Sequence, residues 1–372
     1  MASMWKRWVP AVVAVGVVAS VAITVPMVAE ASATLPTKTP AQVIALVAGS
    51  HVSAFSGTVQ QTSNLGLPSL PSTGPGSSSQ VASTLALLTG THSVRVYVDG
   101  PSRERAQVID QLAERDVIRN GSSVWIYDSK ANTAQHATIP GHASIMKRPG
   151  MSQPGQTKPG QTKPEQQKPE QSMTPSDIAT ALLAKLESTS TVTVGDQVTV
   201  AGRAAYDLVL TPKATDTLIG SVSIAVDSAT GLPLGVDLTA RGETTPAVSV
   251  EFASIDFSKP SASLFTFTPP SGAKVTQEST KKADTSAKRS TKSVTKPKAT
   301  VSGTGWDAVV SVANIPSLTK LQTSSEFGLL TTSVPGGHLF HTSLLNILFT
   351  TDGRVLVGSV SADRLQAVAS AK

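Results

Sequence analysis

Three carboxylates lie near an aromatic strand in the first half of the chain, and paired carboxylates can carry out acid–base chemistry. Glu114, Asp116 and Asp128 flank Trp125 in the sequence, and two carboxyl groups at a suitable separation hydrolyse glycosidic bonds. Acids also alternate with apolar residues on the solvated face of an ordinary β-meander. We favour this second interpretation, so the sequence predicts a protein that is not an enzyme.

The histidines and the missing thiols argue against a metal or redox centre. His338 and His341 are three residues apart beside a predicted strand, so their side chains would point to opposite faces. His136 and His142 flank Pro140 without an acidic residue close by. The chain contains no cysteine, which excludes thiolate zinc ligands, disulfides and a cysteine nucleophile. Because G-x-S-x-G, P-loop and H-E-x-x-H motifs are also missing, we expect no metal and no cofactor.

The N-terminus has the features of a secretory leader. Lys6 and Arg7 precede an apolar run over residues 9–28, and Ala31-Ser32-Ala33 matches an A-x-A cleavage site. We therefore assign residues 1–33 to a signal peptide cleaved after Ala33. An uncleaved membrane anchor is the alternative, because the apolar run approaches the length that spans a bilayer. Either interpretation places the remaining chain outside the cytoplasm, secreted or attached to the outer face of the cytoplasmic membrane.

The positive charge of the chain is concentrated in one segment. The formal net charge is +6, and residues 274–298 contain eight Lys or Arg against two acidic residues. This segment therefore accounts for the whole excess, and the rest of the chain is neutral overall. An aromatic content of 4% argues against a stacking surface for bases, so we expect no nucleic-acid partner.

The residue pattern predicts two capped helices and many strands. Thr39 and Gln42 have the spacing of a capping box around Pro40, and Thr174 precedes a second helix with apolar residues on one face. A short apolar helix is expected over residues 81–88. Strands are expected over residues 54–62, 94–98, 105–110, 116–119, 124–128 and 133–139, and again from 191 to 267.

Composition divides the chain after the leader into three parts. Residues 34–275 form the main domain, which contains a Pro/Gln/Lys-rich insert at 147–173 with two copies of GQTKP. Residues 276–304 are predicted to be a disordered basic linker. Residues 305–372 are expected to form a small α+β module with a hairpin and a last helix capped by Ser361. Because this module is short of core, we expect it to dock on another surface, such as the main domain.

Several motifs of the main domain occur in the order of a known superfamily. They are FSGTV at 55–59, the Asn120-Gly121 hairpin before Trp125, AGRAAY at 201–206, VDSATGLPL at 226–234 and PPSG at 269–272. In this order the chain resembles the LolA-like superfamily, which includes outer-membrane lipoprotein carriers and RseB-type regulators of envelope stress. The resemblance implies an α+β fold with an open, strongly curved antiparallel β-sheet (a half-barrel) and about three helices over its concave face.

The resemblance also implies a function and a site. The protein is expected to be a monomeric, non-enzymatic binder that holds lipid, or the acyl chains of a lipoprotein, in an apolar cavity. From the pattern alone, we favour core filling for the candidate residues, and the resemblance makes a cavity role about equal to it. They come from a Leu-rich irregular segment and from the predicted helices: Leu65, Leu67, Leu85, Leu88, Ile178, Leu182 and Leu186.

Two other functions stay open from the sequence. An RseB-like regulator would sense the state of the envelope and bind a membrane anti-sigma partner, and the linker and C-terminal module favour this role. A scaffold protein would instead lay its basic linker on anionic lipid or wall polymer. Arg203, which follows Gly202 in the AGRAAY strand, has two matching roles. It pairs with a buried carboxylate, which we favour, or it contacts a lipid head group.

Overall fold

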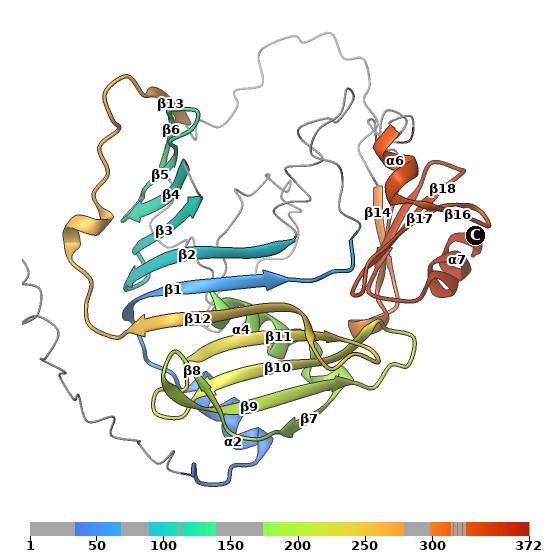
Figure 1. Ribbon diagram of the computed structural model, residues 1–372, viewed down its shortest axis with the longest axis horizontal. Helices are drawn as coiled ribbons and strands as arrows, with labels where there is room; N and C mark the ends of the chain where they lie inside the picture. Colours follow the sequence, from blue (N-terminus) through green and yellow to red (C-terminus); the bar gives the residue numbers. More distant parts are fainter. Residues whose placement is uncertain are drawn as a thin grey trace, which may run out of the picture. The chain divides into compact units, whose positions relative to one another are not determined.

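The computed structural model of the chain describes residues 34–67, 89–110, 113–138, 174–278, 298–313, 315, 318, 322 and 325–371 (Figure 1). The expected leader, the expected helix at 81–88 and the repeat insert lie outside these residues. Residues 279–297 of the expected linker also lie outside them. Contacts group Pro36–Lys372 into one unit.

An open sheet of 13 strands forms the main domain (Figure 1). Its strands follow the order β13-β6-β5-β4-β3-β2-β1-β12-β11-β10-β9-β7, and β8 pairs with β9. The sheet is curved and does not close on itself, which confirms the expected α+β architecture. The strands are β1 (Ala54–Ser63), β2 (Gly90–Asp99), β3 (Arg103–Asp110), β4 (Ala113–Asn120), β5 (Ser123–Asp128), β6 (Thr133–Thr138), β7 (Ser190–Val194), β8 (Val198–Val200), β9 (Arg203–Pro212), β10 (Ile219–Asp227), β11 (Pro233–Ala240), β12 (Pro246–Asp256) and β13 (Lys274–Glu278).

One strand departs from the antiparallel pattern. β13 runs parallel to β6, with Lys274 opposite Thr133 and Glu278 opposite Ala137. The cause is the route of residues 257–273, named the strap here, which leave β12 and contact β3 and β4 before reaching β6. β6 and β13 are separated in the sequence by residues 139–273, and a parallel pair requires such a separation because a tight turn can join only antiparallel strands.

Two described helices pack on the large sheet. α2 (Pro40–Ala48) begins at Thr39, whose hydroxyl accepts from the Gln42 N–H while the Gln42 side chain accepts from the Thr39 N–H. This arrangement confirms the predicted capping box. α4 (Pro175–Leu186) begins at Thr174, which forms reciprocal hydrogen bonds with Asp177. α2 packs on β7 and β9, and α4 packs on β11 and β12.

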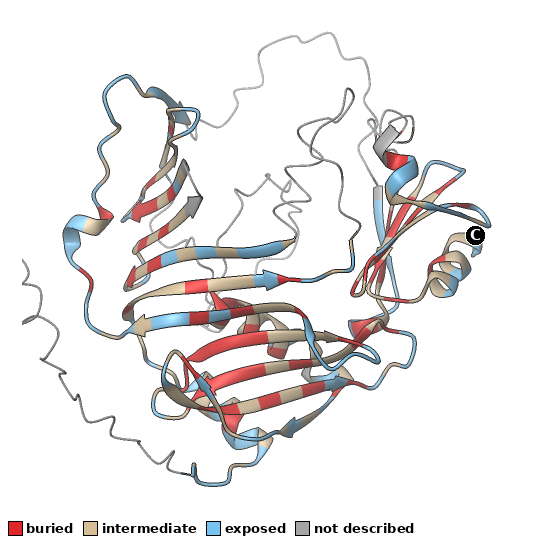
Figure 2. Ribbon diagram, viewed as in Figure 1, coloured by how far each residue is buried: buried red, intermediate tan, exposed pale blue. Residues whose placement is uncertain are grey.

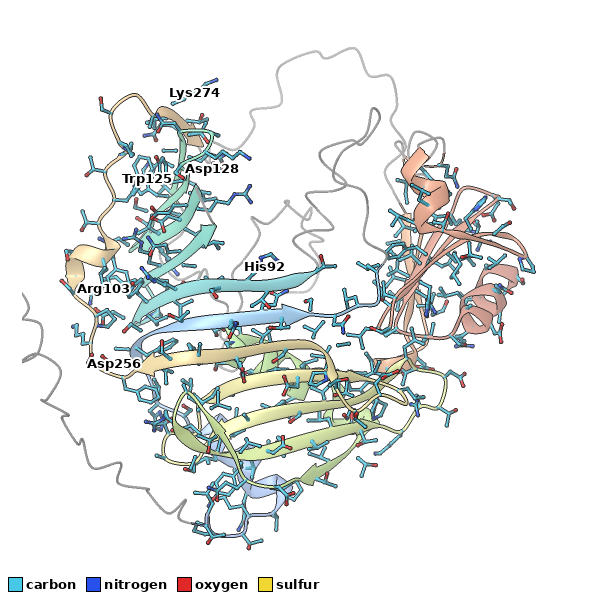
Figure 3. All side chains as sticks on the ribbon, in the orientation of Figure 1. His92, Arg103, Trp125, Asp128, Asp256 and Lys274 are labelled. Atoms are coloured by element: carbon cyan, nitrogen blue, oxygen red, sulfur yellow. The ribbon has the colours of Figure 1, made fainter. Side chains whose placement is uncertain are left out.

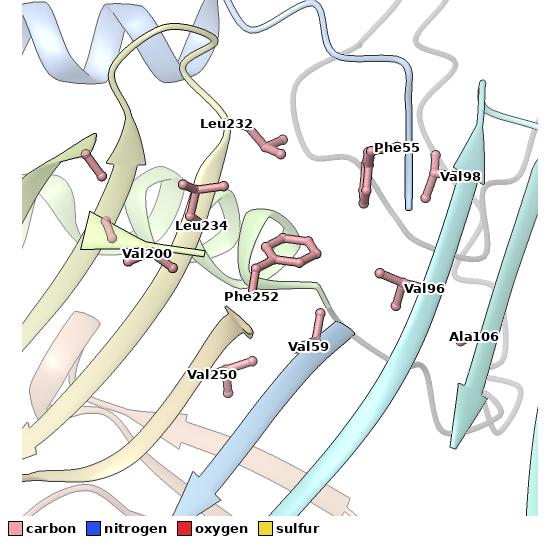
Figure 4. Close-up of a cluster of buried hydrophobic side chains, with 12 residues drawn as sticks. Phe55, Val59, Val96, Val98, Ala106, Val200, Leu232, Leu234, Val250 and Phe252 are labelled. Carbon is pink, nitrogen blue, oxygen red and sulfur yellow. The ribbon is translucent and has the colours of Figure 1, made fainter. Parts of the chain in front are cut away.

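An apolar core lies between α4 and the sheet. Phe55 and Phe252 meet edge to face, with ring centroids 5.9 Å apart, and Ile178 of α4 packs against the same cluster. Buried residues are frequent along β9, β10 and β11 (Figure 2). The buried members of the cluster (Figure 4) are Phe55, Val59, Val96, Val98, Ala106, Val200, Ala205, Ala225, Leu232, Leu234, Val250 and Phe252.

The C-terminal module contains a second sheet, with the strand order β14-β15-β19-β18-β17-β16. The β18–β19 hairpin and a last helix, α7 (Ala362–Ser370), capped by Ser361, match the sequence prediction. β14 and the end of β13 fall within residues 276–304, so backbone pairing extends into the expected linker at both ends. The elements are β14 (Lys298–Ser302), β15 (Val309–Ala313), α6 (Ser325–Leu330), β16 (Thr332–Val334), β17 (Gly337–His341), β18 (Asn346–Thr350) and β19 (Val355–Gly358).

Hydrogen bonds join the C-terminal module to the large sheet. The Leu218 N–H and the Thr217 hydroxyl both donate to the Ser359 carbonyl, each at 2.8 Å. The Trp306 indole N–H donates to the Ser190 hydroxyl at 2.8 Å in a buried position. The module therefore packs on the main domain, as its small core led us to expect.

Candidate functional site

The inner face of β2–β6, defined as the face that carries Val96 and Ala106, bears an apolar floor. Residues directly opposite each other in neighbouring strands share a face, so the register defines rows of side chains. Much of this floor is only half-buried in the structure, so part of it is accessible to a ligand. The floor consists of Val96, Ala106, Val117 and Ile126 in one row and of Val94 and Val108 in the next.

Ionic groups border this floor on two sides. On one side, Arg115 and Asp128 continue the row of Val94 and Val108 onto β4 and β5, and Arg115 Nε donates to a carboxylate oxygen of Asp128 at 3.2 Å. On the other side, Glu104 and Arg119 lie directly opposite each other on β3 and β4, and both are buried. An apolar strip between two ionic rows suits an amphiphilic ligand better than a purely polar one.

Arg119 is 0% exposed and links two turns of the meander. Its Nε donates to the Gly121 carbonyl and its Nη1 to the Pro101 carbonyl, both at 2.9 Å. Its Nη2 has no hydrogen-bond partner among the described residues. Sequence reasoning missed this residue, because nothing in the local pattern separates it from the exposed Arg115 on the same face of β4.

A small pocket lies where the N-terminus of α4 meets β1, β2 and β3. Its volume is about 30 Å³, enough for about two water molecules. An acyl chain does not fit in this pocket as it stands. Its walls combine apolar and polar side chains, among them Phe55, Val98, Leu232, Glu104, Thr174 and Asp177.

The strap covers part of the opposite, outer face. Phe265, within the short helix η4 (Ala262–Phe265), is 1% exposed. Phe267 packs against Trp125 and Tyr127, with ring centroids 5.4 Å apart in both pairs. Figure 3 places Trp125 on the strands beside the strap and Lys274 where the strap has reached β13. Among the described residues, the strap therefore covers the outer face of this part of the sheet.

Of the acidic residues near Trp125, Asp116 and Asp128 lie on opposite faces of the sheet, whereas Glu114 and Asp116 lie on the same face and are joined by a side-chain hydrogen bond. Asp116 lies opposite Tyr127 and Asp128 lies opposite Arg115, so the two carboxylates project from opposite faces of the sheet. Asp116 is 2% exposed and receives a hydrogen bond from Arg105 Nη2 at 2.5 Å. Burial raises the pKa of Asp116 to about 6, against the opposing effect of Arg105.

Arg105 connects this acidic group to the strap. Its Nη1 donates to the Leu264 carbonyl at 3.3 Å, and its Nη2 lies 3.6 Å from a carboxylate oxygen of Glu114. The three charged groups therefore hold the strap to β3 and β4. Their arrangement gives the acids a structural role, but Asp116 is buried and not solvated as the sequence interpretation expected.

Arg203 pairs with a buried carboxylate, in agreement with the role favoured from sequence. Its Nε and Nη2 donate to the two oxygens of Asp227 at 2.8 and 2.9 Å, and the guanidinium lies 4.7 Å from the centre of the Phe257 ring. The Thr230 N–H also donates to Asp227 at 2.9 Å. This network holds the β10–β11 turn and the start of the strap to β9.

The histidines take structural positions in the described part of the chain. His136 stacks on Trp125 at 4.3 Å and shares a hydrogen bond with Ser123 at 2.8 Å. His341 shares a hydrogen bond with Asn346 at 2.7 Å. No group of His, Cys, Asp or Glu residues suited to a metal ion occurs among the described residues. His142 lies outside them.

Three of the candidate cavity residues lie together on α4. Ile178 packs against the core cluster. Leu182 and Leu186 are half-buried on the same helix, whereas Leu183 between them is buried. None of the three lines the small pocket.

The other candidate cavity residues lie in or near the segment that follows β1. Leu65 and Leu67 are half-buried, and the Leu65 carbonyl accepts from the Ser343 N–H of the C-terminal module at 3.1 Å. Leu85 and Leu88 lie outside the described residues. The assignment of all seven residues to a cavity stays a prediction.

Comparison with known proteins gives solved structures but no sequence-level match. No family model matches the chain, and no curated protein matches it. The MucA/MucB complex of Pseudomonas aeruginosa is similar to this chain at 16% identity and a TM-score of 0.42, over 89% of this chain and 96% of that one. A LolA superfamily protein of Nitrosomonas europaea is similar at 10% identity and a TM-score of 0.22, over 62% and 99%.

An uncharacterized conserved protein of Thermus thermophilus is also similar, at 10% identity and a TM-score of 0.34, over 64% of this chain and 98% of that one. MucB and LolA superfamily structures are thus among those similar to this chain, as its motifs predicted. Within the described residues, we find no helix whose length and hydropathy would let it cross a bilayer.

Proposed function

We propose that this protein is a non-enzymatic, extracytoplasmic binding protein that holds lipid, or an acylated protein, against the inner face of β2–β6. The observation that carries this proposal is the half-buried apolar floor between two ionic rows. The strap occupies the outer face of the same strands, which leaves the inner face for a ligand. Each buried methylene of an acyl chain would contribute roughly 0.8 kcal/mol, so few polar contacts are needed.

In this proposal α4 forms the wall opposite the floor. Ile178, Leu182 and Leu186 lie on α4, and we assign Leu65, Leu67, Leu85 and Leu88 to the same cavity. A pocket of about 30 Å³ cannot hold an acyl chain, because ligand cavities are typically at least about 300 Å³. Loading therefore requires α4, or a loop near its N-terminus, to move away from the sheet.

The test uses residues 34–372 purified from the native envelope under mild conditions. Native mass spectrometry followed by lipid extraction should find a stoichiometric acylated species that leaves on denaturation. Val117→Glu places a charge on the floor and should remove this species. Val275→Glu makes the same change at an exposed position on β13 and should retain it. A clean apo mass after incubation with envelope lipids would contradict the proposal.

A regulatory role is the second candidate. It is favoured by the exposed apolar side chains of the C-terminal module, Val301, Val310 and Leu329, which a lipid carrier does not need for its cargo. A regulator of this kind would sense envelope lipid or lipoprotein and bind a membrane anti-sigma partner. Pull-down of such a partner from native membranes, lost when residues 298–371 are deleted, would support this role. Its repeated absence would argue against it.

A further inference from the structure

β14 is an end strand of the C-terminal sheet, and its residues 299–302 lack the features that usually protect such strands. It pairs with β15 in unbroken register from Lys298 to Ser302, and no described strand pairs with its other side. Natural proteins protect exposed edges with charges, prolines or bulges. Residues 299–302 are exposed and read Ala-Thr-Val-Ser, so this part of the edge has none of these.

An apolar row on one face of the sheet leads to this edge. Its exposure increases toward β14, where Val301 is 66% exposed and its neighbour Val310 is 37% exposed. α7 covers the opposite face. Phe327 of α6 packs on Phe349, with ring centroids 5.1 Å apart. The row consists of Val301, Val310, Val357, Ile347 and Phe340, one from each of five neighbouring strands.

We propose that β14 binds an extended, acidic segment of a partner polypeptide by β-strand addition. The added strand would complete the main-chain hydrogen bonds of the edge, and an apolar side chain opposite Val301 would continue the row. Residues 279–297, which lead into β14, contain six Lys or Arg and one Asp. This charge attracts an acidic partner to the edge. The proposal does not depend on lipid binding at the inner face.

A second copy of this chain is a poorer occupant of the same edge. Parallel pairing of two β14 strands would bring two basic segments together, and like charges across an interface oppose association. A five-residue strand also falls far short of the roughly 800 Å² per partner that stable interfaces bury. A short extended segment, bound mainly through its backbone, needs no such area.

The experiment uses residues 34–372 and a fluorescein-labelled peptide, Glu-Asp-Thr-Val-Thr-Val-Thr-Asp-Glu, followed by fluorescence anisotropy at low salt. Two further peptides carry N-methyl groups on alternate residues, each blocking one edge of the extended peptide. We expect the unmodified peptide to bind and one methylated isomer to lose at least tenfold in affinity, while the other isomer binds normally. Hydrogen exchange should slow at amides of Lys298–Ser302 when the peptide is added.

A matched pair of variants locates the binding strand. Val301→Asn should weaken peptide binding at least fivefold, whereas Val275→Asn, the same change on exposed β13, should leave it unchanged. Equal binding of both methylated isomers, or no exchange protection in β14, would show attraction by charge alone and overturn the proposal. Concentration-dependent dimerisation that protects β14 without peptide would also overturn it, in favour of a second copy.

Discussion

Asp227 illustrates how one side chain organises several strands. It is 1% exposed and accepts hydrogen bonds from Arg203 and from the Thr230 N–H. Burial acts to raise the pKa of Asp227, but the hydrogen bonds from Arg203 and Thr230 outweigh it and hold the pKa below its usual value. The stability that this carboxylate contributes is therefore present above about pH 4 and is lost as the pH falls through its lowered pKa.

Replacing this carboxylate should be costly. Asp227→Ala removes the buried acceptor of the hydrogen bonds from Arg203 and Thr230, and because Arg203 is 30% exposed, we expect a cost of about 1.5–3 kcal/mol, typical of hydrogen bonds to a charged group. Asp128→Ala breaks the more exposed pair with Arg115 and should cost less than about 1 kcal/mol. Urea unfolding of both variants at pH 7 measures the difference. Equal free energies of unfolding for the two variants would show that the Arg203–Asp227 pair does not stabilise the fold.

Asp116 makes the opposite contribution to pH dependence. Burial raises its pKa from 3.8 to about 6, so its contribution to stability is full below about pH 4 and is lost as the pH rises through 6. Asp116→Asn cannot ionise. The variant should therefore gain about 2–3 kcal/mol relative to the wild type between pH 4 and pH 7.5, since each pKa unit corresponds to about 1.4 kcal/mol. A difference in unfolding free energy that is constant across this range would contradict the prediction.

At the scale of elements, the strap is a single irregular segment that closes the outer face of the meander. Its two aromatic residues, Phe265 and Phe267, lie against β3–β5 on the side opposite the apolar floor. The strap therefore gives the meander a second layer without an α-helix. It also brings the chain to β6, where it forms the parallel strand β13.

Phe265→Ala should destabilise the protein by about 3–5 kcal/mol, because the buried ring leaves a cavity under the strap. Thr266→Ala, at the exposed neighbouring position, should change the free energy of unfolding by less than about 0.5 kcal/mol. Denaturant titrations followed by tryptophan fluorescence measure both variants. A similar small effect for Phe265→Ala would show that the strap is not packed on the sheet.

Elements with strong local signals were predictable from the sequence. The capping box of Thr39 and Gln42, the Asn120-Gly121 turn and the Ser361 cap each depend on residues within a few positions, and all occur in the structure. One of the two roles predicted for Arg203, pairing with a buried carboxylate, occurs in the structure. The identity of the partner, Asp227, could not be predicted, because it lies 24 residues away in the sequence and only the fold brings it to Arg203.

Features that depend on distant segments could not be predicted. The parallel β13, the strap packing of Phe267 and the burial of Arg119 arise where segments far apart in sequence meet. The candidate site shares this problem, since the apolar floor of Val117 and Ile126 looks like any alternating strand until the register is known. Sequence patterns report which faces are apolar, but they do not report which face the rest of the chain covers.

At the scale of the whole molecule, the C-terminal module is part of the same hydrogen-bonded structure as the large sheet. Thr217 and Leu218 in the β9–β10 connection bond to Ser359, and Trp306 bonds to Ser190. Unfolding of the module should therefore be coupled to that of the main domain, and we expect a single cooperative transition for residues 34–372.

Trp306→Ala should loosen this coupling. It removes a buried ring and its hydrogen bond to Ser190, so we expect a loss of about 3–5 kcal/mol and a separate, earlier calorimetric transition for the module. Val310→Ala, at a partly exposed position in β15, serves as the control and should retain one transition. A single transition in Trp306→Ala would mean that the remaining backbone bonds are sufficient for cooperativity.

The strand order has a consequence for biosynthesis. β1–β6 pair with one another in chain order, but β1 gains its second neighbour only when β12 has been made and β6 only when β13 has been made, at residue 278. The closing of such long loops slows folding relative to local pairing. The two edges of the nascent β1–β6 meander should therefore stay unpaired until β12 and β13 have been made. A prematurely terminated product that ends before β12 would expose two bare edges of a six-stranded sheet, and we expect it to aggregate rather than fold.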